Sequence, residues 1–394
     1  PSAGVAVGLC SGAAVPDYLF DLILGFFALF FAVYLAVIFL LAIIWRFRER
    51  SELASISQST SVSVVVAYRN EISNLPGFIA ALSAQTDFDG NIELIAVNDH
   101  SDDGGDVWMA SQVFARGRMI LIDAQGSGKK AAIREGIEAA SGELIVSCDA
   151  DCVPGPEWIK TIVTKYRQDD ADMLAGPVRM LPGDTLIGQY DAIDYYSLQV
   201  SSAAAIKAGF PVFCSAANMA FRKSAWEEAQ GLMDGQNYLS GDDVFLLHAF
   251  KKLGKRIVFI SDPGAVVDTF SSGSIATCFR QRVRWGGKSR GYKDVASIIL
   301  ALTVFGANLF LLVLLIPVIT GSLPFWLLAA SFVIKAVTDY LLLSGGKRVF
   351  KVTLPFYRYV LIAVIYPFVL VLTASGALLL AEQWKKKAVT SQSL

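Results

Sequence analysis

Two regions of this sequence carry no charged residue over a length that can cross a lipid bilayer. The first, Leu22–Trp45, is 24 residues long. As an α-helix it would span about 36 Å, against roughly 30 Å for a hydrocarbon core, and it is too long for the apolar part of a signal peptide. The second run covers the 40 residues Val295–Ile334 and is broken at Thr320-Gly-Ser-Leu-Pro324. The sequence therefore predicts transmembrane helices over residues 18–45, 295–320 and 322–344.

A further apolar stretch, Tyr359–Ala381, predicts a fourth helix over residues 356–382 that either crosses the membrane or re-enters it. Three arginines within residues 46–50 follow the first span. By the positive-inside rule they hold the chain after that span in the cytoplasm, at the inner (plasma) membrane. A complete fourth crossing would carry the lysines at 385–387 outside, so both alternatives stay open. Tails over 1–17 and 383–394 and a basic linker over 46–60 complete the organisation.

Residues 61–290 have ordinary polarity and are long enough to bury a core of their own. Apolar strand patterns over 61–67, 92–97, 119–123 and 144–148 alternate with helical patterns over 72–85 and 129–140. This alternation predicts a Rossmann-like α/β domain with a doubly wound, mostly parallel sheet. The second half is expected to shape the acceptor site, with a long helix over 185–205, a strand over 211–221 and a short helix opened by Asp242 and Asp243.

Charge and cysteine usage exclude some classes of function. The net charge of −1 argues against a nucleic-acid binder. The five cysteines form no metal-ligand spacing with the two histidines, so Cys148 and Cys152 are interpreted as small buried groups. His100 and His248 are interpreted as ordinary polar positions.

Carboxylates follow several of the predicted strands. The run Glu143–Cys148 leads directly into Asp149 and Asp151, while Glu71 follows the first strand and Asp99 the second. Because the carboxyl ends of parallel strands share one edge of a sheet, we expect these groups to converge. Their mutual repulsion requires a cation or hydrogen-bond donors, and oxygen ligands suit Mg²⁺ or Mn²⁺. The pattern predicts a site that holds a metal and a diphosphate.

Two later motifs complete the pattern, Ser240-Gly-Asp-Asp243 and Gln281-Arg-Val-Arg-Trp285. In this order and spacing, the motifs resemble family 2 of the inverting nucleotide-sugar glycosyltransferases, in the membrane-embedded branch. That branch includes cellulose, chitin, hyaluronan and poly-N-acetylglucosamine synthases and ceramide glucosyltransferases. The resemblance covers about Ser61–Trp285 and the flanking spans, and it implies a GT-A-type fold. The chain departs from it at Ala67-Tyr-Arg-Asn-Glu71, where many relatives have a proline.

The resemblance implies a role for each matching residue. Glu71 and Asp99 would contact the uridine of a UDP-sugar, Asp151 with Asp149 would hold the metal, and Asp243 would be the catalytic base. The residues implied around the nucleotide sugar are Ala67, Glu71, Asp99, Lys129, Asp149, Gln281, Arg284 and Trp285. The last three would close over the diphosphate and the acceptor.

The same roles follow from the chemistry of glycosyl transfer. The developing charge on the diphosphate must be neutralised, which a cation on Asp151 and the guanidinium of Arg284 can do. A single displacement needs one carboxylate to accept the proton of the acceptor hydroxyl, and Asp243 fits that need. Inversion at C1 would give a β-glycoside.

The acceptor is less constrained than the donor. Four predicted helices are fewer than in relatives that secrete a polymer, which favours one addition to the hydroxyl of a membrane lipid. A processive polysaccharide synthase is the alternative, and a non-catalytic sugar-binding membrane protein is a remote one. The sequence identifies neither the sugar, whose pocket is expected near Cys214–Asn218, nor the oligomeric state.

Charged residues near the predicted spans receive a structural interpretation. A basic set at the entry to the second span is expected to contact phospholipid headgroups; its members are Arg280, Arg282, Lys288 and Arg290. Lys335 and Asp339, four residues apart within a predicted span, are expected to neutralise each other.

Overall fold

The computed structural model describes residues 17–47, 60–86, 88, 90–233 and 242–391, without the side chains of 17–19, 242 and 380–391. Most of the predicted N-terminal tail and basic linker, including Arg48 and Arg50, therefore lies outside the described residues. The same holds for Ser240, Gly241 and residues 392–394.

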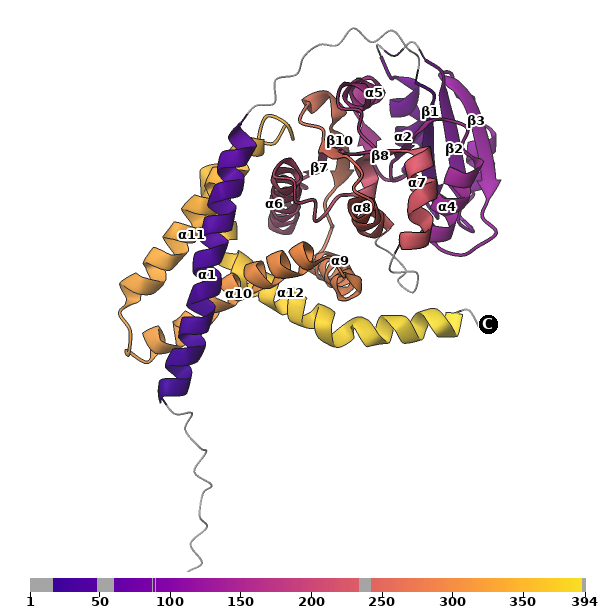
Figure 1. Ribbon diagram of the computed structural model, residues 1–394. Coiled ribbons are helices and arrows are strands. Elements are labelled where there is room, and N and C mark those ends of the chain that lie inside the picture. The colour runs from indigo at the N-terminus through magenta and orange to yellow at the C-terminus, as the bar shows by residue number, and fades with distance from the viewer. Residues whose placement is uncertain (1–16, 48–59, 87, 89, 234–241, 392–394) are drawn as a thin grey trace, which may run out of the picture.

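One domain of strands and shorter helices carries four long helices on one side (Figure 1). The strands are β1 (Val62–Tyr68), β2 (Ile92–Asn98), β3 (Gly117–Asp123), β4 (Leu144–Ser147), β5 (Val153–Pro154), β6 (Met173–Ala175), β7 (Val178–Leu181), β8 (Met219–Arg222), β9 (Ile257–Phe259) and β10 (Val267–Phe270). The helices of the domain are α2 (Leu75–Ser83), α3 (Gly105–Ala110), α4 (Lys129–Ala139), α5 (Trp158–Gln168), α6 (Leu186–Lys207), α7 (Lys223–Ala229), α8 (Asp242–Lys252) and α9 (Ile275–Lys288). The long helices are α1 (Asp17–Arg46), α10 (Val295–Ile319), α11 (Phe325–Gly346) and α12 (Phe356–Ser391).

The main sheet has the strand order β3-β2-β1-β4-β8-β6-β9. Neighbouring strands from β3 to β4 are parallel, β8 is antiparallel to both β4 and β6, and β6 is parallel to β9. Every residue of β1, β2 and β4 is buried, as expected for parallel strands with both faces covered. This arrangement confirms the predicted α/β, mostly parallel fold. The predicted strands and helices of the first half recur with small shifts of their ends.

The prediction of a strand over 211–221 was wrong for residues 211–218. Only Met219–Arg222 pairs as a strand, while residues 216–218 form a short 3₁₀ turn. The backbone N–H of Ala216 points to the carboxylate of Asp243 at 3.3 Å rather than to a neighbouring strand. This segment is apolar because it walls a cavity. A second sheet, β5-β10-β7, was not predicted because its strands have only two to four residues.

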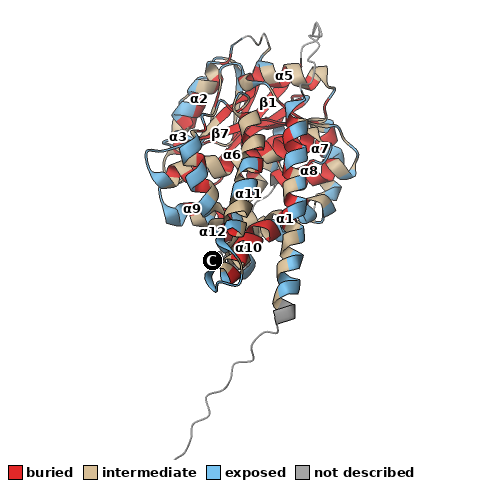
Figure 2. Cartoon of the chain, turned by 90° about the vertical axis from the view of Figure 1, so that its left-hand side faces the viewer, coloured by how far each residue is buried: buried red, intermediate tan, exposed pale blue. Residues whose placement is uncertain are grey.

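Four helices are long and apolar enough to cross a membrane, as predicted: Phe20–Arg46, Val295–Ile319, Phe325–Gly346 and Phe356–Leu379. Large apolar side chains of α1, such as Leu22, Phe26 and Leu29, remain exposed, which is typical of a lipid-facing surface (Figure 2). Inside this bundle Lys335 and Asp339 pair at 2.7 Å, and the hydroxyl of Tyr34 donates to Asp339 at 2.7 Å. The expected structural pair is therefore present, with a third partner from α1.

Helix α6 joins the domain to the bundle. Its Thr185 cap accepts a hydrogen bond from the Gly188 N–H at 3.1 Å. The hydroxyl of Tyr196 donates to the carbonyl of Leu343 in α11 at 2.5 Å. At Gly346 of α11, an added Cβ would lie 2.6 Å from a methyl of Val200, so this close approach requires a glycine.

Candidate active site

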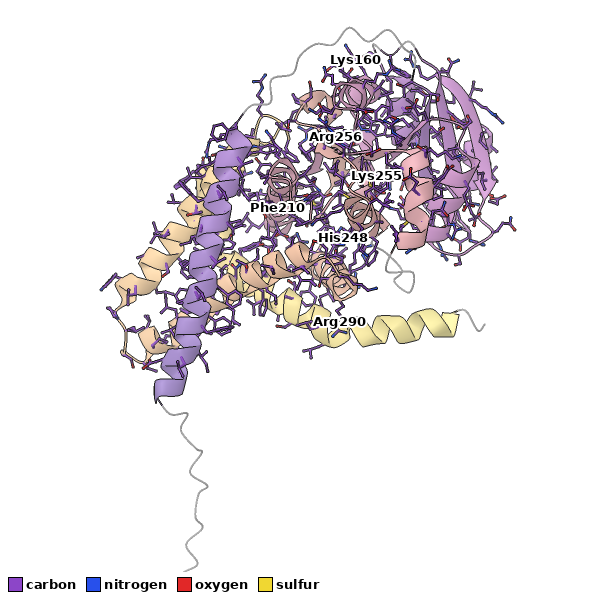
Figure 3. All side chains as sticks on the ribbon, viewed as in Figure 1. Lys160, Phe210, His248, Lys255, Arg256 and Arg290 are labelled. Atoms are coloured by element: carbon purple, nitrogen blue, oxygen red, sulfur yellow. The ribbon has the colours of Figure 1, made fainter. Side chains whose placement is uncertain are left out.

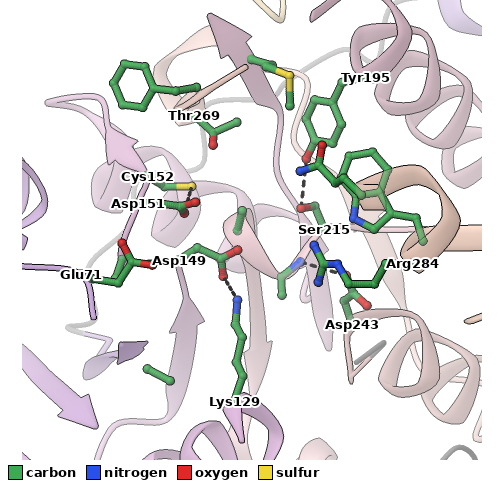
Figure 4. A pocket seen from close by; sticks show the side chains of 18 of the residues that line it. Glu71, Lys129, Asp149, Asp151, Cys152, Tyr195, Ser215, Asp243, Thr269 and Arg284 are labelled. Atoms are coloured by element: carbon green, nitrogen blue, oxygen red, sulfur yellow. Dashed lines mark hydrogen bonds and ion pairs between the residues drawn. The ribbon is translucent and has the colours of Figure 1, made fainter. Parts of the chain in front are cut away.

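A cavity of about 420 Å³ lies outside the carboxyl ends of β1 and β4 (Figure 4). The chain leaves β1 toward β2 and β3 on one side and returns to β4 on the other, and ligands of open α/β sheets bind at such a switch point. All of the residues that the sequence predicts for the site line this one cavity: Ala67, Glu71, Asp99, Lys129, Asp149, Asp151, Asp243, Gln281, Arg284 and Trp285.

The part of the cavity beyond β1 and β2 is held by hydrogen bonds from nearby loops. The carboxylate of Asp99 accepts from the backbone N–H of Gly128 at 2.8 Å, just before α4. The Glu71 carboxylate accepts from Asn74 at 2.6 Å. Burial raises the pKa of Glu71, the Asn74 hydrogen bond opposes this, and the charge of Asp151 adds to it. Burial also raises the pKa of Tyr68 to about 12, so its hydroxyl remains a donor at neutral pH.

Asp149 and Asp151 emerge together from the end of β4. The ammonium of Lys129, the first residue of α4, lies 2.6 Å from Asp149. Burial lowers the pKa of Lys129, but Asp149 and then Asp151 raise it more, so the net direction is upward. Burial, followed by the charge of Asp149, raises the pKa of Asp151. Lys129 pairs directly with Asp149, so the negative charge of Asp151 is only partly compensated.

This carboxylate pair fits a hard divalent cation. Within the described residues no group of three or more His, Cys, Asp and Glu side chains is placed to hold a metal. Mg²⁺ commonly binds through one or two carboxylates and takes its other ligands from phosphates and water. Asp151 and Asp149 supply that donor set at the wall of a cavity wide enough for a diphosphate.

Asp243 faces the carboxylate pair from the opposite wall (Figure 4). Its carboxylate accepts from the backbone N–H groups of Val244 at 2.9 Å and Ala216 at 3.3 Å. Because β8 is antiparallel to β4, the residues just before β8 reach the same sheet edge as Asp149. The ammonium of Lys288 lies 3.8 Å from the Asp243 carboxylate. These contacts fix the orientation of a carboxylate that still faces the cavity.

One face of α9 forms the remaining wall. Gln281, Arg284, Trp285 and Lys288 follow helical spacing, so they project from the same side of the helix. The Trp285 ring lies against Tyr195 of α6, with ring centroids 5.6 Å apart. The motif is thus a helix face positioned over the cavity.

The segment Cys214–Asn218, which was expected near the sugar, contributes Ser215, Ala216 and Ala217 to the cavity wall, whereas Tyr195, Lys288 and Tyr292 were not predicted. Lys288 could have been found, since it lies one helical turn beyond Arg284 and Trp285. Tyr195, whose hydroxyl lies 3.2 Å from that of Ser215, carries no motif that a single sequence reveals.

The prediction of headgroup contacts was wrong for Arg282 and Lys288. Lys288 lines the cavity, while Arg282 is buried on an adjacent face of α9. Its guanidinium forms ion pairs with Asp191 at 2.7 Å and Asp194 at 2.5 Å, both in α6. Arg290 donates to the carbonyl of Leu378 in α12, beside which Figure 3 places it. The basic run before α10 therefore includes Arg282, a buried cation that joins α9 to α6.

The buried cysteines agree with the sequence analysis, since Cys148, Cys152, Cys214 and Cys278 are all free and buried. The Nε2 of His248 forms a hydrogen bond with the Ser297 hydroxyl at 3.1 Å, and this bond joins α8 to α10. Burial lowers the pKa of His248. Both features are structural, as expected.

Residues 59–288, more than half of the chain, match the family model described as glycosyltransferase like family 2. The chain therefore belongs to this family and is a glycosyltransferase. The non-catalytic alternative accordingly loses its support.

Two curated relatives illustrate the similarity. The undecaprenyl-phosphate 4-deoxy-4-formamido-L-arabinose transferase of Aeromonas hydrophila subsp. hydrophila is 32% identical over 110 residues, which are 27% of this chain and 34% of that protein. An N-acetylglucosaminyltransferase of Rhizobium leguminosarum bv. viciae is 24% identical over 292 residues, 68% of each chain. The chain thus spans about a third of the length of the first relative and about two thirds of the second.

Among solved structures, a mannosyltransferase from Pyrobaculum calidifontis, in complex with GDP-Man and Mn²⁺, resembles this chain with a TM-score of 0.54 at 17% identity. The match covers 85% of this chain and 100% of that one. It confirms the GT-A-type fold.

Replacing Arg282 with leucine should strongly destabilise the protein. It would leave the fully buried Asp191 without a counter-ion, a change that costs about 3–5 kcal/mol in comparable buried pairs. The melting temperature of the detergent-solubilised protein should fall markedly, and Asp191→Asn in the same background should recover part of the loss. Arg280→Leu, at an exposed position of the same helix, serves as the control. Equal melting temperatures for the two single variants would contradict the assignment.

Proposed function

We propose that this glycosyltransferase moves a sugar from a UDP-sugar to the hydroxyl of a membrane lipid, with inversion, to give a β-glycoside. The observation that carries the proposal is the cavity itself. A carboxylate pair at one wall, a separate carboxylate at the opposite wall and a helix face with cations above them are the groups that a single displacement needs.

The donor would occupy the side of the cavity formed by β1, β2 and β4. We assign Glu71 and Asp99, with the backbone near Ala67, to the uridine, and Lys129 and Asp149 to the sugar side of the nucleotide. The complex of the Pyrobaculum calidifontis enzyme with GDP-Man supports a nucleoside diphosphate sugar as donor class. Uridine rather than guanosine is our inference from the sequence resemblance.

Asp151, together with Asp149, is the pair that we assign to Mg²⁺ or Mn²⁺. When bound, such a cation supplies positive charge opposite the departing diphosphate. The Mn²⁺ in the solved mannosyltransferase supports this assignment.

The remaining residues would carry the transfer. The acceptor oxygen attacks C1 as the bond from C1 to the diphosphate oxygen breaks, and UDP leaves with that electron pair. Asp243 accepts the proton of the attacking hydroxyl. Arg284 and Lys288, on the cavity face of α9, stabilise the negative charge that develops on the diphosphate. Trp285, packed against Tyr195 with the two rings tilted, offers an apolar surface to a sugar ring.

A lipid acceptor is favoured by the position of the site. The cavity is walled by α9, which packs against α12 and leads into α10, so an amphiphile at the bilayer surface lies close to Asp243. The relative that uses undecaprenyl-phosphate, by its name, supports a lipid substrate. We place the catalytic domain on the cytoplasmic side of the inner membrane. The positive-inside rule predicts this side, and the UDP-sugar donor is found there.

A processive synthase is the second candidate. The N-acetylglucosaminyltransferase similarity over 68% of both chains favours it, as does the aromatic pair that could retain a sugar product.

Product analysis separates the two candidates. Purified full-length protein in lipid vesicles, incubated with labelled UDP-sugars, should yield a chloroform-soluble product that carries one sugar. Detergent-solubilised enzyme should stall and recover when a hydroxyl-bearing lipid is added. A long, glycosidase-sensitive polymer made from UDP-sugar alone would instead establish the synthase.

Asp243→Asn should lower the transfer rate by about 10²-fold or more, because the amide cannot accept the proton of the attacking hydroxyl. UDP binding, measured by calorimetry on the solubilised protein, should be unchanged. Asp242→Asn, which removes the adjacent carboxylate, is the matched control. Transfer that survives in Asp243→Asn and is lost in Asp242→Asn would move the base to Asp242.

Asp151→Ala should abolish most transfer, and EDTA should do the same to the wild-type protein, since the leaving diphosphate loses its compensating charge. Asp102→Ala removes a carboxylate near the same sheet edge but outside the cavity and should leave activity intact. Full turnover in EDTA, recorded as UDP release, would refute the metal assignment.

A further inference from the structure

A second cavity, of about 190 Å³, lies where the catalytic domain meets the membrane helices. Its walls come from β7, from α6 and from the connection between α11 and α12 with the first turn of α12. Because α11 is a candidate membrane span, the connection that follows it, residues 347–355, is expected at the membrane surface.

The lining of this cavity is cationic. Lys351 and Arg358 both face it, and within the described residues neither forms an ion pair with a carboxylate. Residues 340–381 contain no Asp or Glu at all. The Arg358 Nε donates to the Tyr357 hydroxyl at 3.0 Å, which orients the guanidinium without neutralising it. The cavity therefore presents uncompensated positive charge.

Arg179 has a different task in the same cavity. Its guanidinium binds both carboxylate oxygens of Asp268, at 2.7 and 2.6 Å, so its charge is compensated. Its remaining terminal nitrogen donates to the carbonyl of Lys351 at 3.0 Å. Lys351 has a φ of 51°, in the left-handed region that non-glycine residues seldom adopt. The Arg179 contact thus holds the connection next to a residue whose backbone conformation is rare.

Much of the remaining lining is apolar, with Leu181, Ile193, Val352 and Pro355 beside the cations, while Gln189, Tyr196 and Thr353 add polar groups. Phe356 and Tyr357, which follow directly, are exposed, as aromatic residues at a membrane surface commonly are. A ligand that fits this combination has an anionic head and an apolar body, and it reaches the cavity from the bilayer.

The second cavity adjoins the active site. Met180 lines both cavities, and in the register of the small sheet it pairs with Thr269, which lines the active site. A methionine side chain is unbranched and flexible, so it forms a wall that a ligand can displace.

We propose that the second cavity binds the anionic headgroup, a phosphate or carboxylate, of the lipid acceptor and so presents a hydroxyl of that lipid to the active site past Met180. This inference rests on the proposed function, which supplies the lipid acceptor. The cationic lining of the cavity is the reason why the headgroup is anionic. It narrows the acceptor from any hydroxyl-bearing lipid to an anionic one.

Binding is tested on the full-length protein in detergent, with phosphatidylglycerol as the probe and phosphatidylcholine as the neutral comparison. The wild-type protein should bind phosphatidylglycerol selectively. The double variant Lys351→Ala/Arg358→Ala should bind it about tenfold or more weakly, because two charge-assisted hydrogen bonds are lost. Lys347→Ala/Arg348→Ala removes the same charge from the same connection but outside the cavity and should bind as the wild type does. An equal loss in both double variants would mean general attraction to an anionic surface and would overturn the site.

Two further arms complete the test. If inorganic phosphate binds as tightly as phosphatidylglycerol, the cavity is a site for a free anion and the proposal of a lipid site is overturned. Transfer of labelled sugar to a membrane lipid extract should weaken in the cavity variant and recover at higher lipid concentration. If transfer is unchanged although lipid binding is lost, the cavity does not bind the acceptor, and the proposal is overturned.

UDP binding serves as the control for folding. It should be the same in all variants, and a variant that binds UDP more weakly has a folding defect. If it falls, Lys351→Gln/Arg358→Gln, which preserves side-chain length, replaces the alanine pair. A wild-type protein that binds phosphatidylglycerol selectively but transfers no sugar to any lipid would refute the proposed function, and with it the acceptor role, while its headgroup binding would still be measured directly.

Discussion

Repulsion between carboxylates is the constraint on which the rest of this structure depends. The parallel strands β1, β2 and β4 bring Glu71, Asp99, Asp149 and Asp151 to one sheet edge, and burial raises the pKa of both Glu71 and Asp151. Such a cluster is stable only where positive charge or N–H donors face it. Lys129, at the start of α4, and the backbone N–H of Gly128 supply part of this. What remains uncompensated is suited to a cation and to the positive face of α9.

Helix α9 therefore has to be held over the cavity, and a contact from its adjacent face holds it there. Arg282 pairs with Asp191 and Asp194 of α6, and α6 in turn is bound to α11 through Tyr196 and the close approach at Gly346. The residues of α9 that face the cavity are thus connected through buried contacts to the membrane helices. In the lipid transfer that we propose, this connection would set the height of the active site above the bilayer.

The elements that could be predicted from the sequence are those with strong local patterns. The apolar runs of β1, β2 and β4 and the carboxylates that follow them have one sensible interpretation, because strands of a parallel sheet are buried on both faces. The strands of the second sheet have too few residues for a period to emerge. The apolar residues 211–218 resembled a strand because a cavity wall and a buried strand select the same side chains. Arg282 was misjudged because its acidic partners lie in α6, far away in the sequence.

The contacts of α12 bear on the two topologies that the sequence left open. The start of this helix follows a connection whose Lys351 carbonyl is bound by Arg179 of β7, on the side of the catalytic domain. Twenty or so residues later, an added Cβ on Gly286 of α9 would meet Ala377 at 3.0 Å, and Arg290 donates to Leu378. Both ends of the apolar part therefore face the catalytic domain, and Figure 1 shows the helix running beneath it, across the direction of α1. This placement supports our proposal that α12 lies along the membrane surface or re-enters it rather than crossing. Under this proposal the lysines at 385–387 would lie on the same side of the membrane as Arg46, which is the arrangement that the positive-inside rule favours.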